Sequence, residues 1–443
     1  MKMARKGFLG MMFILLVAIS VACSSGGGIS GDGGGGSDAN GTRSNGQGAS
    51  AGGGATTLKL FNYKVEIAEQ LAKLVEIYEQ EFGVEIQLET VGGGASYEDA
   101  LRAKFAQGDY PDIFNNGGYT DLELYLEHLE DLTDEPWAEN VPPFAREPMT
   151  HEGRLYGMPV GLEGYGYIYN KDIFAAAGIE KLPKTLTELR EAAEMLKAQG
   201  ITPFSNGYAE WWVLGNHLVN IPFALQDDPD AFIQAAREGN VDFASNEIFQ
   251  QWVDLLDLTL EFGNPNPLTA DYNTSVTLFA SGETAMIQQG NWTQVQISSI
   301  NPDINIGFLP MAINDDADAM DRLPVGVPSN WVIYKHSPVK DQAKHFLNWL
   351  VTSETGQHYL TEEFKFIPGV DNIDVEADVL GDLANDIMAY SQEGRTISWV
   401  FHKFPGASGT SRELAAAMQS YIAGEMDREQ MLNEFGRIMA EAE

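Results

Sequence analysis

The sequence contains a single cysteine, Cys23, which excludes an internal disulfide and a cysteine-based metal cluster. Basic residues are also scarce: 27 Lys and Arg stand against 64 Asp and Glu, and the formal net charge is −37. Nucleic acid would repel such a chain, and a basic patch for an anionic membrane surface is not expected. Apolar residues, in contrast, fill 44% of the 443 positions, which suffices for two to three domains with large cores.

Motifs of several common enzyme classes are also missing. There is no G-x-x-x-x-G-K-[ST] run, so the chain has no phosphate loop for ATP, and any ATP hydrolysis must belong to a partner. There is no H-E-x-x-H run and the seven histidines are scattered, which argues against a catalytic zinc ion. The acidic run 315–318 begins like a calcium loop but lacks the glycine and the closing glutamate of one. We therefore expect no metal and no cofactor.

Residues 1–22 have the three-part pattern of a secretory signal peptide. Three basic residues open the segment, an apolar run over 8–18 follows that is short for a membrane span, and small residues lead to Cys23. A cysteine directly after such a site resembles the lipobox of bacterial lipoproteins, which implies that Cys23 becomes the lipidated first residue of the mature chain. An ordinary signal peptide with an incidental cysteine is the alternative.

Residues 23–56 are predicted to form the lipidated cysteine and a flexible tether. The segment consists mainly of Gly, Ser, Ala, Asn and Thr, and Ile29 is its only large aliphatic residue. Such a composition cannot bury enough apolar surface to offset the entropy of ordering. We expect it to hold a globular body away from a membrane.

The globular body starts near Thr57 with alternating strand and helix patterns. Apolar residues at Leu71, Leu74 and Tyr78 have helical spacing, and Gly83 is a plausible helix end. The predicted order is strand 58–63, helix 67–82, strand 84–88, helix 97–107 and strand 112–114. This order predicts an α/β protein with a largely parallel sheet.

A set of motifs then carries a family resemblance. The run 108–114 resembles the "GD-x-PDI" signature of family 1 extracellular solute-binding proteins, the receptor subunits of ABC importers for sugars. Further motifs of that family follow in the same order: 155–160 with 169–174 ("YG-x-P…YNK-x-x-F"), 183–186 ("PKTW", with Leu for Trp), 279–292 ("F-x-x-GETAM…G-x-W") and 343–347 ("AKEFL"). The variant at 161–166 is similar to multiple-sugar and raffinose-type receptors.

The resemblance implies a two-lobed periplasmic-binding-protein type II fold, with a hinge and a ligand cleft between the lobes. By analogy, residues 57–160 and 311–370 form the N-lobe, and residues 161–310 and 371–443 form the C-lobe. It also implies a monomer without catalytic activity on the extracytoplasmic face of a bacterial membrane. Its partners would be a carbohydrate and the permease and ATPase of an ABC importer.

Sugar binding needs polar groups for the hydroxyl rim and flat aromatic side chains for the C–H face. Glu163 is the first rim candidate, because it lies at the predicted lobe crossing and matches a family position that often holds a carboxylate. Trp292 matches the tryptophan that stacks on sugars across the family. For each residue the alternative is an ordinary structural role, as a solvated carboxylate or as a core indole.

Six more ligand candidates come from position along the chain. Trp211 is favoured over its neighbour Trp212, since adjacent residues of a regular element face different ways. Trp331 follows a predicted lobe crossing, where ligand contact and core packing are about equally expected. Ligands of open α/β sheets bind beyond the carboxyl ends of strands, which is where four polar residues lie: Asn62, Tyr63, Asn115 and Asn116. Ordinary turn formation is the alternative for these four.

Three functions stay open at this point. The first is a receptor for a sugar or oligosaccharide. The second is the same fold with a non-sugar ligand such as a quaternary amine, whose cation would need an aromatic cage. The third is an extracellular glycoside hydrolase, which needs two carboxylates at a set separation; with so many carboxylates the sequence does not exclude it.

Overall fold

Two separate hydrophobic cores organise the part of the chain that the computed structural model describes, residues 56–92, 95–406 and 408–442. One core draws its residues from 58–160 and 327–373, and we call this unit the N-lobe. The other core draws almost all of its residues from 165–323 and 380–439, and we call it the C-lobe. Each lobe is therefore assembled from segments that lie far apart in the sequence.

The N-lobe sheet has the strand order β2-β1-β3-β12-β6. The first three strands run parallel, because helices connect them, whereas β12 runs antiparallel to both of its neighbours. The strands are β1 (Thr56–Asn62), β2 (Val84–Thr90), β3 (Ile113–Asn116), β6 (Met158–Pro159) and β12 (Asn330–Ile333), and β4 (Thr150–His151) pairs with β5 (Arg154–Leu155) in a small hairpin.

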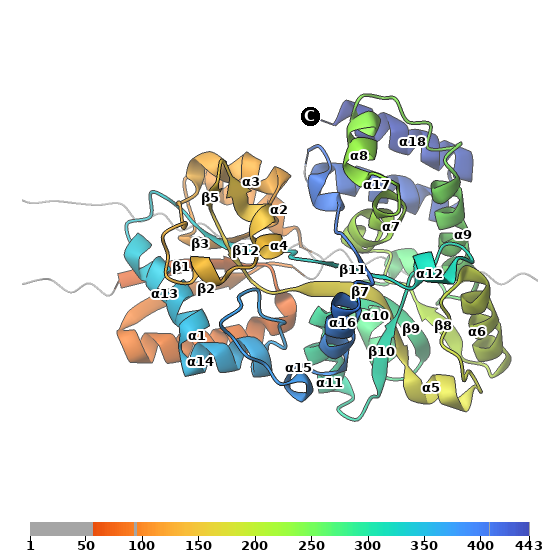
Figure 1. Ribbon diagram of the computed structural model, residues 1–443, viewed down its shortest axis with the longest axis horizontal. Helices are drawn as coiled ribbons and strands as arrows, with labels where there is room; N and C mark the ends of the chain where they lie inside the picture. The colour runs from red at the N-terminus through yellow and green to blue at the C-terminus, as the bar shows by residue number, and fades with distance from the viewer. Residues whose placement is uncertain (1–55, 93–94, 407, 443) are drawn as a thin grey trace, which may run out of the picture. The chain divides into compact units, whose positions relative to one another are not determined.

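Helix α1 (Ala68–Phe82) shows how the N-lobe core forms. Its buried face carries Leu71, Leu74 and Tyr78, and it ends at Gly83 in the left-handed conformation, as the sequence predicted. The ring centroid of Tyr78 lies 5.0 Å from that of Phe346 in α13 (Lys340–Thr352), so α1 and α13 pack against each other. Figure 1 shows the cyan α13 beside the orange-red α1. The other helical segments of this lobe are η1 (Val65–Ile67), α2 (Tyr97–Gln107), α3 (Thr120–Tyr125), η2 (Leu126–His128), η3 (Ala138–Asn140), α4 (Pro143–Arg146), η4 (Glu147–Met149), α13 (Lys340–Thr352), α14 (Glu354–His358) and η8 (Tyr359–Glu363).

The C-lobe sheet is built around the buried strand β7 and has the order β13-β11-β7-β9-β8, with β10 also paired to β7. The expectation of a largely parallel sheet is wrong for this lobe: β7 runs antiparallel to β9, β10 and β11. Hydrophobic patterns reveal a buried strand but not its direction. The strands are β7 (Glu163–Asn170), β8 (Thr202–Ser205), β9 (Thr284–Gly290), β10 (Ile306–Leu309), β11 (Leu323–Gly326) and β13 (Thr396–Ile397).

Helices surround the C-lobe sheet and complete its core. Two of the helical segments matter most for the site: the π-helical turn η5 (Val213–Leu218) and helix α17 (Ser408–Ile422). The others are α5 (Lys171–Ala176), α6 (Leu186–Ala198), α7 (Val219–Ala224), α8 (Pro229–Arg237), α9 (Glu247–Glu261), η6 (Pro267–Thr269), α10 (Tyr272–Ala280), η7 (Asn291–Thr293), α11 (Gln294–Ile300), α12 (Ala317–Met320), α15 (Ala377–Leu380), α16 (Asp382–Gln392), η9 (Phe401–Lys403) and α18 (Arg428–Glu441).

The second passage between the lobes lies later than the expected boundary at 310/311. Met311, Ile313 and Leu323 belong to the C-lobe core, and Val325 of β11 pairs with Gly164 of β7. The chain enters the N-lobe core only at Val327. The third passage, between Ile373 and Leu380, also lies beyond the expected 370/371. An apolar run packs equally well in either core, so its composition does not show which lobe it joins.

None of the helices in the described residues is long and apolar enough to cross a membrane. The predicted signal peptide, Cys23 and the predicted tether up to residue 55 lie outside the described residues. Thr56, which was assigned to the tether, is the first residue of β1.

Candidate functional site

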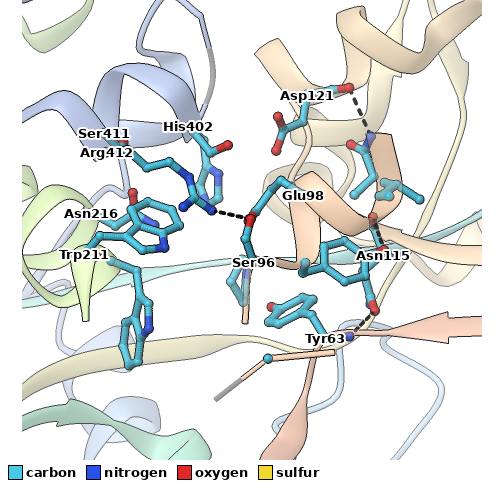
Figure 2. A pocket seen from close by; sticks show the side chains of 18 of the residues that line it. Tyr63, Ser96, Glu98, Asn115, Asp121, Trp211, Asn216, His402, Ser411 and Arg412 are labelled. Carbon is cyan, nitrogen blue, oxygen red and sulfur yellow. Dashed lines mark hydrogen bonds and ion pairs between the residues drawn. The ribbon is translucent and has the colours of Figure 1, made fainter. Parts of the chain in front are cut away.

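A cleft of about 330 Å³ is lined by residues of both lobes, and its volume falls in the range of small-molecule binding sites. The N-lobe side follows the carboxyl ends of β1 and β3, and the C-lobe side comes from β7, η5 and the segment from Trp399 to Arg412. Its polar and aromatic lining includes Tyr63, Lys64, Glu66, Ser96, Glu98, Asn115, Asn116, Thr120, Asp121, Glu163, Glu210, Trp211, Trp212, Asn216, His217, Tyr272, Trp292, Trp399, Phe401, His402 and Arg412. Figure 2 shows part of this lining, with N-lobe residues such as Glu98 facing C-lobe residues such as Arg412.

Six of the eight side chains predicted to bind ligand line this cleft, namely Tyr63, Asn115, Asn116, Glu163, Trp211 and Trp292. The other two do not line it. Trp331 is fully buried in β12, between β3 and β6, and belongs to the N-lobe core. Asn62 is also fully buried, and its amide donates a 3.0 Å hydrogen bond to the Lys64 carbonyl at the end of β1. Both residues therefore shape the sheet edge from behind the cleft surface.

The amides of Asn115 and Asn116 are already engaged in holding the cleft floor. Asn115 Oδ1 accepts from the Tyr63 backbone N–H at 3.2 Å, and its Nδ2 donates to Ser329 Oγ at 3.0 Å. Asn116 Nδ2 donates to the Asp121 carbonyl, and its Oδ1 accepts from the Gly118 N–H at 2.8 Å. These bonds fix the loop after β3, so the turn-forming alternative for Asn116 also holds in this structure.

A buried ion pair in the lining of the cleft joins the two lobes. Lys64, just after β1, donates to Glu163 Oε1 at the start of β7, and Glu66 Oε1 lies 3.1 Å from the same ammonium. Only 3% of the Lys64 side chain and 6% of the Glu163 side chain are exposed. Burial raises the pKa of Glu163, and the ammonium of Lys64 partly offsets that rise. Burial by itself would lower the pKa of Lys64, but Glu163, Tyr63 and Glu66 hold this pKa well above its ordinary value.

An aromatic wall forms the C-lobe side of the cleft. The ring of His217 lies between the indoles of Trp212, Trp292 and Trp399, at centroid distances of 5.2, 5.1 and 5.8 Å. The indole of Trp292 is held by a 3.0 Å hydrogen bond from its Nε1 to Gln289 Oε1. Trp292 also lies near Trp212 and Trp399, with both centroid distances at 6.4 Å, so the four rings form one connected aromatic cluster.

Carboxylate and imidazole groups complete the wall. Glu210 accepts from Trp212 Nε1 and from the Tyr272 backbone N–H, both at 3.1 Å, which fixes the Trp212 ring. Burial, with a smaller contribution from His402, lowers the pKa of His217 to about 3, and burial lowers the pKa of His402 to about 4. Both imidazoles are therefore neutral at neutral pH, and each can donate one hydrogen bond and accept another.

Arg412 extends from the C-lobe across the cleft to the N-lobe. Its Nη2 donates to Glu98 Oε2 at 2.7 Å and to Ser96 Oγ at 2.9 Å (Figure 2). Its guanidinium carbon lies 4.1 Å from the ring centroid of Trp211. A further link between the lobes, in addition to Arg412 and the Lys64–Glu163 pair, runs from Thr120 Oγ1 to the His402 carbonyl at 2.9 Å.

Asp121 is a cleft carboxylate without a cationic partner within ion-pair distance among the described residues. Its Oδ2 and His402 Nδ1 approach Gly117 from opposite lobes: a Cβ on Gly117 would lie 2.6 Å from the first atom and 3.2 Å from the second. Burial and the nearby Glu98 raise the pKa of Asp121 to about 7, against partial compensation by the Gly117 backbone and Arg102.

Four buried polar atoms of the cleft lining have no hydrogen-bond partner among the described residues. They are Tyr272 Oη, Trp399 Nε1, His402 Nε2 and Arg412 Nε. Buried polar groups are normally paired in native proteins, so this concentration in one cleft favours a polar ligand that supplies the missing partners.

Several cleft residues were not predicted from the sequence, including Lys64, Glu98, Asp121, Glu210 and Arg412. They lie in segments without a recognisable motif. From sequence alone, a single charged residue of the cleft looks the same as a charged residue on the solvent-exposed surface. A π-helical turn such as η5 often marks a functional site, but no residue pattern predicts such a turn from the sequence. Among the described residues, no group of three or more His, Cys, Asp and Glu side chains could hold a metal ion.

Comparison with known proteins gives a consistent result. A family model described as bacterial extracellular solute-binding protein matches residues 36–357. The melibiose/raffinose/stachyose-binding protein MelE of Bacillus subtilis (strain 168) is 23% identical over 329 residues, which cover 72% of this chain and 74% of that protein. The maltotriose-binding protein of Pyrococcus abyssi (strain GE5 / Orsay) is 25% identical over 302 residues, which cover 66% of this chain and 61% of that protein.

Solved structures show the same fold. The solute-binding protein RafE in complex with raffinose has a TM-score of 0.76 at 19% identity, covering 87% of this chain and 99% of that one. A chitin oligosaccharide binding protein has a TM-score of 0.74 at 23% identity, covering 88% and 99%. The fold is thus the two-lobed α/β fold of periplasmic binding proteins, with a mixed sheet in each lobe.

Proposed function

This chain belongs to the bacterial extracellular solute-binding proteins, and on that premise we propose that it is the sugar receptor of an ABC importer. The observation that carries the proposal is the cleft, in which an aromatic wall faces carboxylate and amide groups. Receptors of this family have no catalytic activity, so the glycoside hydrolase alternative is set aside. The proposed partners are a carbohydrate and the permease of the importer, whose ATPase would supply the energy.

The two sides of the cleft suit the two sides of a sugar ring. The indole of Trp292 offers a flat apolar face for the C–H face of a pyranose, and the indole of Trp399 borders it at an angle of 87° between the ring planes. The unpaired Tyr272 hydroxyl and His402 imidazole, together with the carboxylate of Asp121, can bond to hydroxyls at the rim. Relatives of this chain carry names for binding raffinose, stachyose and chitin oligosaccharides, which supports an oligosaccharide as the ligand.

The charge of the lining favours a neutral sugar over an anionic one. Five carboxylates, those of Glu66, Glu98, Asp121, Glu163 and Glu210, stand against three basic side chains. Each of those three is already ion-paired: Lys64 with Glu163, Arg102 with Asp99 and Arg412 with Glu98. A phosphorylated or uronic sugar would therefore enter a negative cleft without a free cation among its described residues.

A quaternary amine is the second candidate, because the lining is both aromatic and negative. A cation of this kind is best held by rings that surround it and leave a gap. Here Trp212 and Trp292 touch, with centroids 6.4 Å apart, and the ring of His217 occupies the space beside them. The rings form a wall instead of a cage, which favours the sugar.

The finer points of the proposal concern location and ligand contacts. We propose that Cys23 carries a lipid that anchors the receptor to the extracytoplasmic face of the cell membrane, with residues 24–55 as the tether. Of the cleft residues, we propose that Trp292 and Trp211 stack on sugar rings. We propose that Tyr63 and Asn115 shape the N-lobe side and that Glu163 acts mainly through Lys64.

Titration calorimetry of the purified protein tests the proposal. The panel consists of raffinose, stachyose, maltotriose and a chitin oligosaccharide, with glycine betaine as the quaternary-amine probe and sn-glycerol 3-phosphate as the anionic probe. We expect saturable binding of at least one neutral oligosaccharide and none of sn-glycerol 3-phosphate. Binding of glycine betaine with no response to any oligosaccharide would reverse the choice between the two candidates.

A further inference from the structure

Arg412 connects two bodies that have separate cores. It stands on α17, whose residues Leu414 and Met418 are buried in the C-lobe core. Its partner Glu98 stands on α2, which is anchored in the N-lobe core by Leu101. The 2.7 Å bond between them therefore exists only while the two lobes lie together.

The contact of Arg412 with the N-lobe is specific. Ser96 is the N-cap of α2, and its Oγ accepts from the Asp99 backbone N–H at 3.1 Å as well as from Arg412 at 2.9 Å. The guanidinium thus meets a hydroxyl and a carboxylate on the same turn of one helix. Ser96, Glu98 and Arg412 all line the cleft, so this contact closes one side of it (Figure 2).

The same guanidinium also fixes a candidate stacking residue. It lies over the ring of Trp211, at 4.1 Å from the centroid, while Trp211 itself lines the cleft. This placement depends on Gly215 in η5, because a Cβ there would clash with the carbonyl of Ser411, next to Arg412. The absence of a side chain at 215 lets α17 approach η5 closely enough to set the guanidinium on the indole.

We propose that Arg412 is a positioning residue that couples the Trp211 stacking surface to closure of the two lobes. When the lobes meet, Glu98 and Ser96 hold the guanidinium, and the guanidinium holds the indole in the orientation that faces the ligand. When the lobes part, the guanidinium loses its N-lobe partners and the indole loses its orientation. The proposal rests on the proposed function, since it describes how the same cleft binds its sugar.

If the Arg412–Glu98 pair were only structural, its loss would lower the folding stability of the protein. The exposure of the two side chains argues against a large contribution to that stability. The Arg412 side chain is 27% exposed and that of Glu98 is 34% exposed. Ion pairs with this exposure contribute little to folding. They can still shift an open–closed equilibrium, because the bond is present in one state only.

The test compares Arg412→Gln, Glu98→Gln and the double variant with the matched control Arg428→Gln. Arg428 is 31% exposed and also bonds to carboxylates, Asp254 and Asp257, but within the C-lobe. The measurements are oligosaccharide affinity by calorimetry, radius of gyration by X-ray scattering with and without the sugar, and the melting temperature of the free protein.

We expect each cleft variant to bind the sugar about threefold to tenfold more weakly. This is the size of effect expected from the loss of a partly exposed ion pair and of the cation–π contact that the ion pair holds in place. The double variant should be no weaker than Arg412→Gln, because both changes break the same link. Arg412→Lys, which keeps the charge without the planar stack, should lie between wild type and Arg412→Gln. The radius of gyration without sugar should rise in the cleft variants, and Arg428→Gln should match wild type in affinity and radius.

Three results would overturn the inference. They are wild-type affinity in Arg412→Gln, additive losses in the double variant, or a large fall in melting temperature with an unchanged radius. The radius without sugar is measured independently of any ligand. If wild type binds no neutral oligosaccharide but the cleft variants still expand, the proposed function fails while the lobe-closing role of Arg412 stands.

Discussion

Replacement of Glu163 should destabilise the protein more than it weakens sugar binding. The sequence alone suggests a direct bond from this carboxylate to a ligand hydroxyl. In the structure its Oε1 accepts from Lys64 at the passage between the lobes, and the side chain is nearly fully buried. In Glu163→Gln the acceptor oxygen is kept and the charge is lost, which leaves the buried ammonium of Lys64 with Glu66 as its one carboxylate partner.

The size of the effect follows from burial. Removal of one partner from a buried ion pair costs about 3–5 kcal/mol, because the other charge is left uncompensated. Glu66 remains 3.1 Å from the ammonium of Lys64 and is itself only 8% exposed, so we place the cost lower, at about 2–3 kcal/mol. With about 2–4 °C of melting temperature per kcal/mol for a unit of lobe size, the expected fall is roughly 5–10 °C.

Scanning calorimetry of Glu163→Gln and Glu163→Ala without ligand measures this fall, and titration with the best sugar measures affinity. The control is Glu123→Gln, a change at an exposed position of α3 with no expected effect on either quantity. We expect the affinity of Glu163→Gln to stay within about threefold of wild type, since Lys64 and not the sugar holds the carboxylate. Wild-type melting combined with a tenfold or greater loss of affinity would refute this reasoning and make Glu163 a direct ligand group.

Three further predictions concern a carboxylate, an indole and the anchor. Asp121 has a pKa of about 7 in the folded protein against 3.8 ordinarily, so the folded state binds this proton more tightly and the contribution of Asp121 to the free energy of unfolding falls as pH rises from about 4 to 7. The lowered pKa values of His217 and His402 act in the opposite direction over the same range. Asp121→Asn should therefore make the slope of melting temperature against pH more positive than in wild type, and an unchanged slope would count against the shift. Trp292→Ala should weaken sugar binding by about 1–3 kcal/mol and reduce the sugar-induced changes in tryptophan fluorescence and radius of gyration; normal binding and closure would leave Trp211 as the stacking residue. Cys23→Ser should release the protein from the membrane fraction or block its maturation, and retention with normal maturation would exclude the lipid anchor.

The local elements were largely predictable, because each depends on residues close together in the chain. The 3.6-residue spacing of α1 and its end at Gly83 follow from a single stretch of sequence. The position of Tyr63 and Asn115 in the cleft follows from strand ends, which meet at one edge of a parallel sheet. The indole of Trp292 was predicted through a motif of the family, and that of Trp211 because adjacent residues of a regular element face different ways.

The contacts that hold the cleft together were not predictable, because they join residues far apart in the sequence. Arg412 meets Glu98 across 314 positions, and Lys64 meets Glu163 across 99. In a chain with 64 acidic residues, nothing marks the two carboxylates that pair across the lobes. The predicted position of the chain's second passage between the lobes was wrong for a related reason. Strand β11 belongs to the C-lobe because it pairs with β7, and the pairing partner of a strand cannot be read from the sequence of that strand alone.

The motif around Trp292 shows how a residue pattern can be recognised without its physical cause. The structure supplies that cause: a Cβ on Gly290 would overlap the six-membered ring of Trp292, two residues further on. The indole lies back over the end of β9, and this position brings it against His217 and Trp399 in the wall. A side chain at 290 would overlap both this indole and the backbone carbonyl of Gly164 in β7. Glycine at this position is therefore a requirement of the binding surface as much as of the strand.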